Sequence, residues 1–121
     1  MPPSAPLLVE TVKDVTVVSI QDASLVDGRI IDAVQKDLLD MVEKRARRRM
    51  IVDFSSVKFL SSAALGMLLT LHKAIGERRG LLVLCGLRTE IAKMFKLSGL
   101  HKFFTVKKDE KKALQDFGVF L

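Results

Sequence analysis

The sequence has few aromatic residues and none of the features that direct a chain into or across a membrane. Seven Phe are present but no Trp or Tyr among 121 residues, so a core must be largely aliphatic. No apolar run approaches the ~20 residues of a membrane-spanning helix. The N-terminus lacks the basic and apolar regions of a signal peptide. We therefore expect a cytoplasmic protein without a membrane span.

All three prolines fall within the first six residues. This clustering predicts a loose tail over residues 1–6. The remaining residues, 7–121, are enough for a single domain with one core. A mean hydropathy of +0.26 argues against a disordered chain.

Few residues suit catalysis or metal binding. The single cysteine, Cys85, cannot form an internal disulfide, and its apolar neighbours predict an inert buried thiol. His72 and His101 have no further His or Cys at metal-ligand spacing. Glycine-rich phosphate loops and Gly-x-Ser-x-Gly nucleophile motifs are also absent. The sequence therefore predicts no metal site, no cofactor and no catalytic residues.

Positive charge is concentrated in one short run. The net charge is +6, and residues 44–49 (KRARRR) supply five of the positive charges, so the rest of the chain carries only +1. A nucleic-acid-binding protein usually spreads its cations over a face, so we interpret this run as a solvated helix end and expect no direct contact with nucleic acid. A strand of ~17 Å should separate it from the serine pair described below.

Hydrophobic periodicity predicts alternating strands and helices after an opening hairpin. Two β-rich runs, residues 7–12 and 15–20, flank a tight turn at Lys13-Asp14. A polar loop over 21–28 precedes a helix over 29–44, whose apolar residues recur at i+4 steps. The later predicted elements are strand 50–54, loop 55–60, helix 62–75, strand 81–85, helix 89–97, edge strand 103–106 and helix 109–116.

This order predicts a single α/β domain. We expect a mostly parallel mixed sheet of about five strands, an N-terminal hairpin and about four helices. Asp109 should cap the last helix, and Gly99 should follow the end of the helix before it. The side chains of that preceding helix expected to point inward are Ile91, Met94, Phe95 and Leu97.

The stretch over residues 51–69, IVDFSSVKFLSSAALGMLL, is the most informative part of the chain. Asp53 ends a strand, where its carboxylate would accept backbone N–H bonds. One of Ser61 and Ser62 should cap the following helix, whose free N–H groups favour an anion such as phosphate. That helix is apolar almost all round and should be deeply buried. Three small residues are expected to let it approach the sheet closely: Ala63, Ala64 and Gly66.

Residues 53–66, DFSSVKFLSSAALG, resemble the signature of the STAS domain, the fold of bacterial anti-anti-sigma factors. The stretch 94–100, followed by Phe103-Phe104, resembles the third helix and last strand of that family. The resemblance follows the element order from Leu7 to the C-terminus. It implies a STAS fold and the regulatory role of an anti-sigma factor antagonist.

The resemblance also implies a switch. In the family, an anti-sigma factor that is itself an ATP-binding serine kinase phosphorylates the serine at this helix start, and the phosphate blocks binding. Carried onto this chain, the phosphate acceptor is Ser62 and the partner is an anti-sigma factor with serine kinase activity. Two positions depart from the family: Ser61 replaces an acidic residue, and Ala63-Ala64 replaces Ser-Gly.

The expected partner-binding surface is the loop and helix start around Ser62. Val57, Phe59 and Leu60 are expected to be exposed apolar anchors, although Phe59 could equally fill the core. The predicted contact residues are Asp53, Ser55, Ser56, Val57, Phe59, Ser61, Ser62, Ala63 and Gly66. Two alternatives stay open. One is a STAS subunit without a phosphate switch, as a structural component of a signalling or lipid-transport complex; the other is an enzyme with Ser62 as nucleophile.

Overall fold

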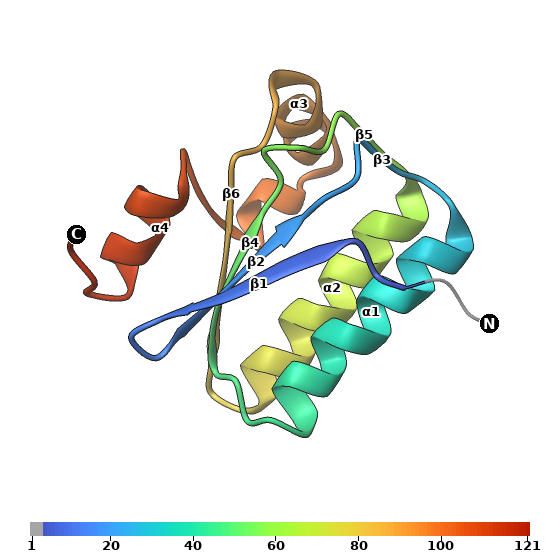
Figure 1. Cartoon of the computed structure of the whole chain (residues 1–121). Helices are drawn as coiled ribbons and strands as arrows, with labels where there is room; N and C mark the ends of the chain where they lie inside the picture. Colours follow the sequence, from blue (N-terminus) through green and yellow to red (C-terminus); the bar gives the residue numbers. More distant parts are fainter. Residues whose placement is uncertain (1–3) are drawn as a thin grey trace.

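A five-stranded mixed sheet forms the centre of the protein, as the sequence predicts. The computed structural model describes residues 4–121. The strand order is β1-β2-β4-β6-β7, with β1 antiparallel to β2 and every other neighbouring pair parallel (Figure 1). Lys13, at a φ of 57°, forms the predicted turn of the hairpin. The strands are β1 Leu7–Val12, β2 Val15–Ile20, β4 Arg49–Asp53, β6 Leu81–Cys85 and β7 Thr105–Lys107.

Helices cover both faces of this sheet. Two of them, α1 and α2, lie side by side on one face, and α4 packs against the other (Figure 1). Successive strand residues therefore point into two different cores, as in any sheet covered on both sides. Val52 faces α1 and α2, whereas Ile51 faces α4. The helices are α1 Gly28–Glu43, α2 Ser62–Glu77, α3 Thr89–Ser98, the 3-10 helix η1 Leu100–Lys102 and α4 Glu110–Asp116.

Local side-chain capping marks the start of α1 and of α4. Asp27 accepts a hydrogen bond from the Arg29 N–H at 2.8 Å at the start of α1. Asp109 accepts one from the Lys112 N–H at 2.9 Å at the start of α4, as predicted. Gly99 follows α3 with a φ of 77°, also as predicted. The aliphatic core and the four α-helices are confirmed.

Two expectations near α3 are wrong. Leu97 was expected to point inward but is 91% exposed, because it is offset by about 240° around the helix from the buried Ile91. The last strand begins at Thr105 rather than at Phe103, since the 3-10 helix η1 ends at Lys102 and Phe103-Phe104 form the turn that follows it. Phe104 alone of the Phe103-Phe104 pair is buried.

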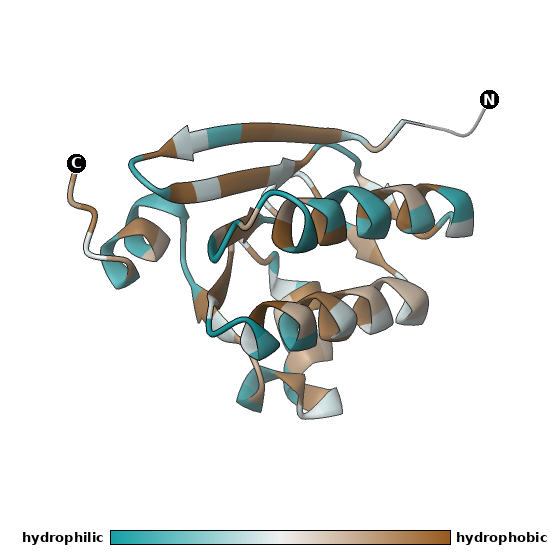
Figure 2. Cartoon of the chain, turned by 90° about the horizontal axis from the view of Figure 1, so that it is seen from below, coloured by the Kyte–Doolittle hydropathy of each residue, from teal (hydrophilic) through white to brown (hydrophobic). Residues whose placement is uncertain are grey.

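The apolar helix α2 is only half buried. Ala63, Gly66 and Leu69 are exposed, because the sheet and α1 cover only part of its circumference. Gly66 was expected to let α2 pack closely on the sheet. This expectation is wrong, because a Cβ atom at Gly66 would meet nothing within 4 Å. Figure 2 shows that α2 is apolar or neutral along most of its length, whereas α1 carries hydrophilic residues.

A small second sheet was not predicted. Strand β3 (Ser24–Leu25) pairs in parallel with β5 (Phe59–Leu60), inside two segments that were expected to be loops. Two-residue strands carry too short a pattern to be recognised in a sequence.

Part of the predicted tail, Met1–Pro3, lies outside the described residues, so the boundary at residue 6 stays a prediction. Within residues 4–121, no helix combines the length and hydrophobicity needed to cross a membrane.

Candidate functional site

The segment over residues 54–61 joins β4 to α2 at the carboxyl edge of the parallel strands. This edge is where open α/β sheets usually bind their ligands. The carbonyl of Ala23 accepts hydrogen bonds from the Lys58 N–H at 2.8 Å and the Phe59 N–H at 3.0 Å. The carbonyl of Leu25 accepts one from the Ser61 N–H at 3.2 Å. These bonds hold the segment against the β2–α1 connection and fix the direction in which α2 begins.

Ser61 and Ser62 differ in their surroundings. The hydroxyl of Ser61 accepts a hydrogen bond from the Ala64 N–H at 3.2 Å and caps α2, so one serine of the pair caps the helix as predicted. Ser62 is the first residue of the helix and is exposed. Its hydroxyl makes no hydrogen bond to any residue within 4–121. It lies at the positive end of the helix dipole, which favours a negative group there.

Asp53 holds the start of the β4–α2 loop in place through hydrogen bonds to Ser55. Its Oδ1 accepts hydrogen bonds from the Ser55 N–H at 2.8 Å and from the Ser55 hydroxyl at 2.5 Å, as predicted for an aspartate at a strand end. Gly86, at a φ of 70°, lies against this pair, and a Cβ there would be 2.6 Å from the same oxygen. Asp53 is only 9% exposed, so it positions the loop rather than presenting a charge to solvent.

A second carboxyl group, Glu110 from the start of α4, meets Asp53. The hydrogen bond to Asp53 raises the pKa of Glu110 to about 7, helped by burial and by the negative charges of Asp53 and Glu10. Burial opposes ionisation of Asp53, but hydrogen bonds from Glu110 and Ser55 outweigh it and hold its pKa below the usual value. Below about pH 7 the proton of this pair therefore resides on Glu110 rather than on Asp53. Nothing in the sequence pattern relates residues so far apart in the chain.

The structure separates the predicted contact residues by exposure. Val57 and Leu60 were expected to be exposed anchors but are 0% and 6% exposed, because both belong to the main core. Phe59, for which the sequence allows either an exposed anchor or a core residue, is 62% exposed, since β5 turns alternate side chains to opposite sides. Ser61 is half-buried. The predicted contact residues that are exposed are Ser55, Ser56, Phe59, Ser62, Ala63 and Gly66.

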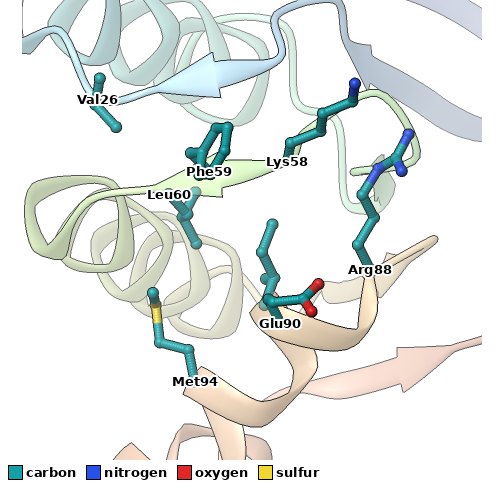
Figure 3. A pocket seen from close by; sticks show the side chains of 8 residues that line it. Val26, Lys58, Phe59, Leu60, Arg88, Glu90 and Met94 are labelled. Atoms are coloured by element: carbon teal, nitrogen blue, oxygen red, sulfur yellow. The ribbon is translucent and has the colours of Figure 1, made fainter.

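A pocket of about 440 Å³ lies beside β5 (Figure 3). Its walls come from three segments, namely the β2–α1 connection, residues 58–60 and the start of α3. Of these segments, the sequence predicted a binding surface only at Phe59 and Leu60 and placed Ile91 and Met94 in the core, because no motif links the three segments. The lining residues are Val26, Lys58, Phe59, Leu60, Arg88, Glu90, Ile91 and Met94.

The basic run lies at the opposite edge of the sheet, as predicted, because Arg49 begins β4 and Asp53 ends it. Only Lys44 caps α1; residues 45–48 form a loop and Arg49 begins β4, so the run extends past the helix end. Arg49 pairs with Asp14 and donates to the carbonyl of Phe117. Arg48 donates to the carbonyl of Val42 at 2.7 Å.

The remaining candidate residues are placed for packing. The His72 ring meets the Phe104 ring edge-on at 5.1 Å, ten residues or ~15 Å along α2 from Ser62. His101 Nδ1 lies 3.4 Å from the carbonyl oxygen of Phe95. Burial, with the charges of Asp53 and Glu110, raises the pKa of the Cys85 thiol to about 12. Within residues 4–121, no three His, Cys, Asp or Glu side chains are grouped closely enough to hold a metal ion.

The fold and this site define a small α/β domain with an exposed serine at a helix start. The sequence model of the STAS domain matches residues 7–113. The chain belongs to the STAS domain family, as the resemblance of residues 53–66 indicated.

Known relatives include anti-sigma factor antagonists. The anti-sigma F factor antagonist of Paenibacillus polymyxa is 23% identical over 93 residues, covering 77% of this chain and 80% of that protein. A STAS-domain protein of Pseudomonas aeruginosa is 30% identical over 83 residues, covering 67% and 82%.

Solved structures of anti-sigma factor antagonists have a similar fold. An anti-sigma factor antagonist from Mycobacterium paratuberculosis has a TM-score of 0.80 at 25% identity, covering 97% of this chain and 100% of that one. Phosphorylated SpoIIAA of Bacillus has a TM-score of 0.72 at 18% identity, covering 92% and 98%, and shows the fold alone.

Proposed function

We propose that this chain is an anti-sigma factor antagonist that binds an anti-sigma factor through the surface around Ser62. Phosphorylation of Ser62 switches the binding off. The observation that supports this proposal best is the division of roles in the serine pair. Ser61 caps α2, whereas Ser62 is exposed with a hydroxyl free for transfer of a phosphate.

The surface around Ser62 suits close contact with another protein. Ala63 and Gly66 are exposed small residues on the first turns of α2, so a partner can approach the helix backbone. Phe59 offers an exposed aromatic side chain of the kind that anchors interfaces. A phosphate on Ser62 would bring about −1.5 to −2 charges onto this surface. Desolvating those charges against a partner would oppose binding.

The partner in this proposal is an anti-sigma factor with serine kinase activity that binds the ATP itself. The chain acts as its substrate and binding partner in the cytoplasm and is not an enzyme. We expect no labelling of Ser62 by a serine-reactive phosphonate, because neither histidine approaches it as a general base.

The experiment uses the anti-sigma factor kinases encoded in the same genome. Each is incubated with the chain and ATP, and phosphorylation is located by mass spectrometry. Calorimetry then compares binding of the wild type, Ser62→Ala and Ser62→Asp. We expect phosphate on Ser62 only, and a loss of about tenfold or more in affinity for Ser62→Asp.

The matched control is Ser4→Asp, which adds the same charge at an exposed residue outside the proposed surface. We expect it to bind as the wild type does. Phosphate at another residue, or equal affinity of Ser62→Asp and Ser4→Asp, would refute the switch.

A second candidate function is a STAS subunit without a phosphate switch in a larger signalling or transport complex. Ser61 favours it, because a kinase that requires the family's acidic residue before the acceptor would not recognise this chain. Stable binding to a large complex, unchanged in both Ser62 variants, would support this alternative over the first.

A further inference from the structure

The pocket beside β5 has an apolar side and a cationic side. Leu60 and Ile91 are buried and form part of its wall, with Met94 half-buried beside them. Figure 3 shows the Lys58 and Arg88 side chains together at one side of the opening, away from Val26 and Met94. A volume of about 440 Å³ exceeds what one aliphatic side chain fills.

Among residues 4–121, the two cations are without an intramolecular ion-pair partner. Within residues 4–121, neither Lys58 nor Arg88 takes part in a salt bridge or a side-chain hydrogen bond. Arg88 is also the N-cap residue of the ten-residue helix α3 and gives it no side-chain cap, so free N–H groups add positive potential. Glu90 also lines the pocket, and it offsets one of the two charges.

We propose that a segment of the protein partner docks here by placing an apolar side chain in the pocket and an adjacent acidic residue beside Lys58 and Arg88. The occupant is a protein segment because the mouth is bordered by exposed apolar side chains, Val26 at 51% and Phe59 at 62%. Phe59 also belongs to the surface proposed around Ser62, so the two surfaces are continuous. The proposal thus rests on the proposed function and adds the chemistry of the partner segment.

The pocket can be tested without the partner. The probes are blocked dipeptides that combine Leu with Glu, and matched ones that combine Leu with Lys, each in both orders. Binding is followed by NMR of the Ile91 and Met94 methyl groups, with the methyl groups of Ile51, in the other core, as an internal reference. At low salt we expect the acidic dipeptides to bind with dissociation constants about fivefold lower than those of the basic ones.

A double variant, Lys58→Gln with Arg88→Gln, should abolish this preference while leaving the fold intact, because both side chains are exposed. The matched control is Lys93→Gln with Lys102→Gln, which removes the same charge from exposed residues outside the lining. It should keep the preference. No shift of the Ile91 and Met94 methyl groups, or equal binding of acidic and basic dipeptides, would overturn the proposal.

Octanoate serves as a small-molecule probe. If it binds about tenfold or more tightly than the acidic dipeptides, the pocket is a site for amphipathic carboxylates and the partner-segment proposal is wrong. Weaker binding of octanoate supports the protein segment. The dipeptide preference and the phosphorylation of Ser62 are separate measurements, so either the pocket or the switch can fail alone.

Discussion

At the scale of single residues, Gly86 leaves no room for a larger side chain beside the loop. Its positive φ of 70° is strained for other residues, and an added Cβ would be 2.6 Å from Asp53 Oδ1 and would overlap the Ser55 hydroxyl. We expect Gly86→Ala to lower the free energy of unfolding by about 2–3 kcal/mol, measured by urea denaturation.

Gly66→Ala is the matched control for Gly86→Ala. The added methyl group at Gly66 meets nothing within 4 Å inside a helix, so we expect a gain in stability of about 0.5–1 kcal/mol. Equal effects of the two substitutions would show that the contact of Gly86 with Asp53 and Ser55 does not constrain the loop.

Single residues were predictable where the cause is local. Asp53 was expected to accept bonds at a strand end, and the residue it binds, Ser55, is two positions away. Asp53 shares a proton with Glu110, which belongs to the last helix, α4, and is far from Asp53 in the sequence. Its role depends on tertiary structure alone. Val57 was misjudged for the same reason, because only the folded loop shows that it enters the core.

At the scale of elements, the start of α2 allows the roles of the two serines to be separated. The Ser61 hydroxyl oxygen accepts the capping hydrogen bond from the Ala64 N–H, so Ser61→Ala should lower the free energy of unfolding by about 1 kcal/mol. Ser62→Ala should change it by less than about 0.5 kcal/mol, because the hydroxyl is exposed and makes no hydrogen bond to residues 4–121. Thermal or urea denaturation measures both. A larger loss of stability for Ser62→Ala than for Ser61→Ala would show that Ser62, not Ser61, caps the helix.

Elements with a repeated pattern or a clear cap were predictable. The i+4 spacing of α1 and the Asp109 cap of α4 both depend on neighbours within one turn. Strands β3 and β5 were missed because two residues show no period and each is defined by its partner. The prediction that Leu97 points inward was wrong because it rested on the apolar character of the side chain and not on its angular position around the helix.

At the scale of the whole molecule, the sheet separates the basic run from the candidate site. Strand β4 begins in the basic run at Arg49 and ends at Asp53 beside the candidate site. Strand alternation predicted this separation from the sequence, since parallel strands share their carboxyl edge. The pocket beside β5 was not predictable, because it needs three segments that only the tertiary fold brings together.

The shared proton of Glu110 and Asp53 makes the stability of the whole molecule depend on pH. The pKa of Glu110 is raised from 4.5 to about 7 in the folded state, so folding favours the protonated form. Its stabilising contribution is present in full below about pH 4.5 and is lost as the pH rises toward 7. The pKa of Asp53 is lowered instead, so its contribution is lost only at more acidic pH, below its ordinary value of 3.8.

Glu110→Gln isolates this effect, because the amide can donate to Asp53 without titrating. We expect the stability of the wild type relative to Glu110→Gln to fall between pH 4.5 and 7.5, as the wild-type carboxyl group loses its proton beside Asp53. Urea denaturation of both proteins across this range gives the difference, to which the groups common to both proteins contribute equally. A difference that stays constant with pH would mean that Glu110 is ionised throughout and does not share a proton with Asp53.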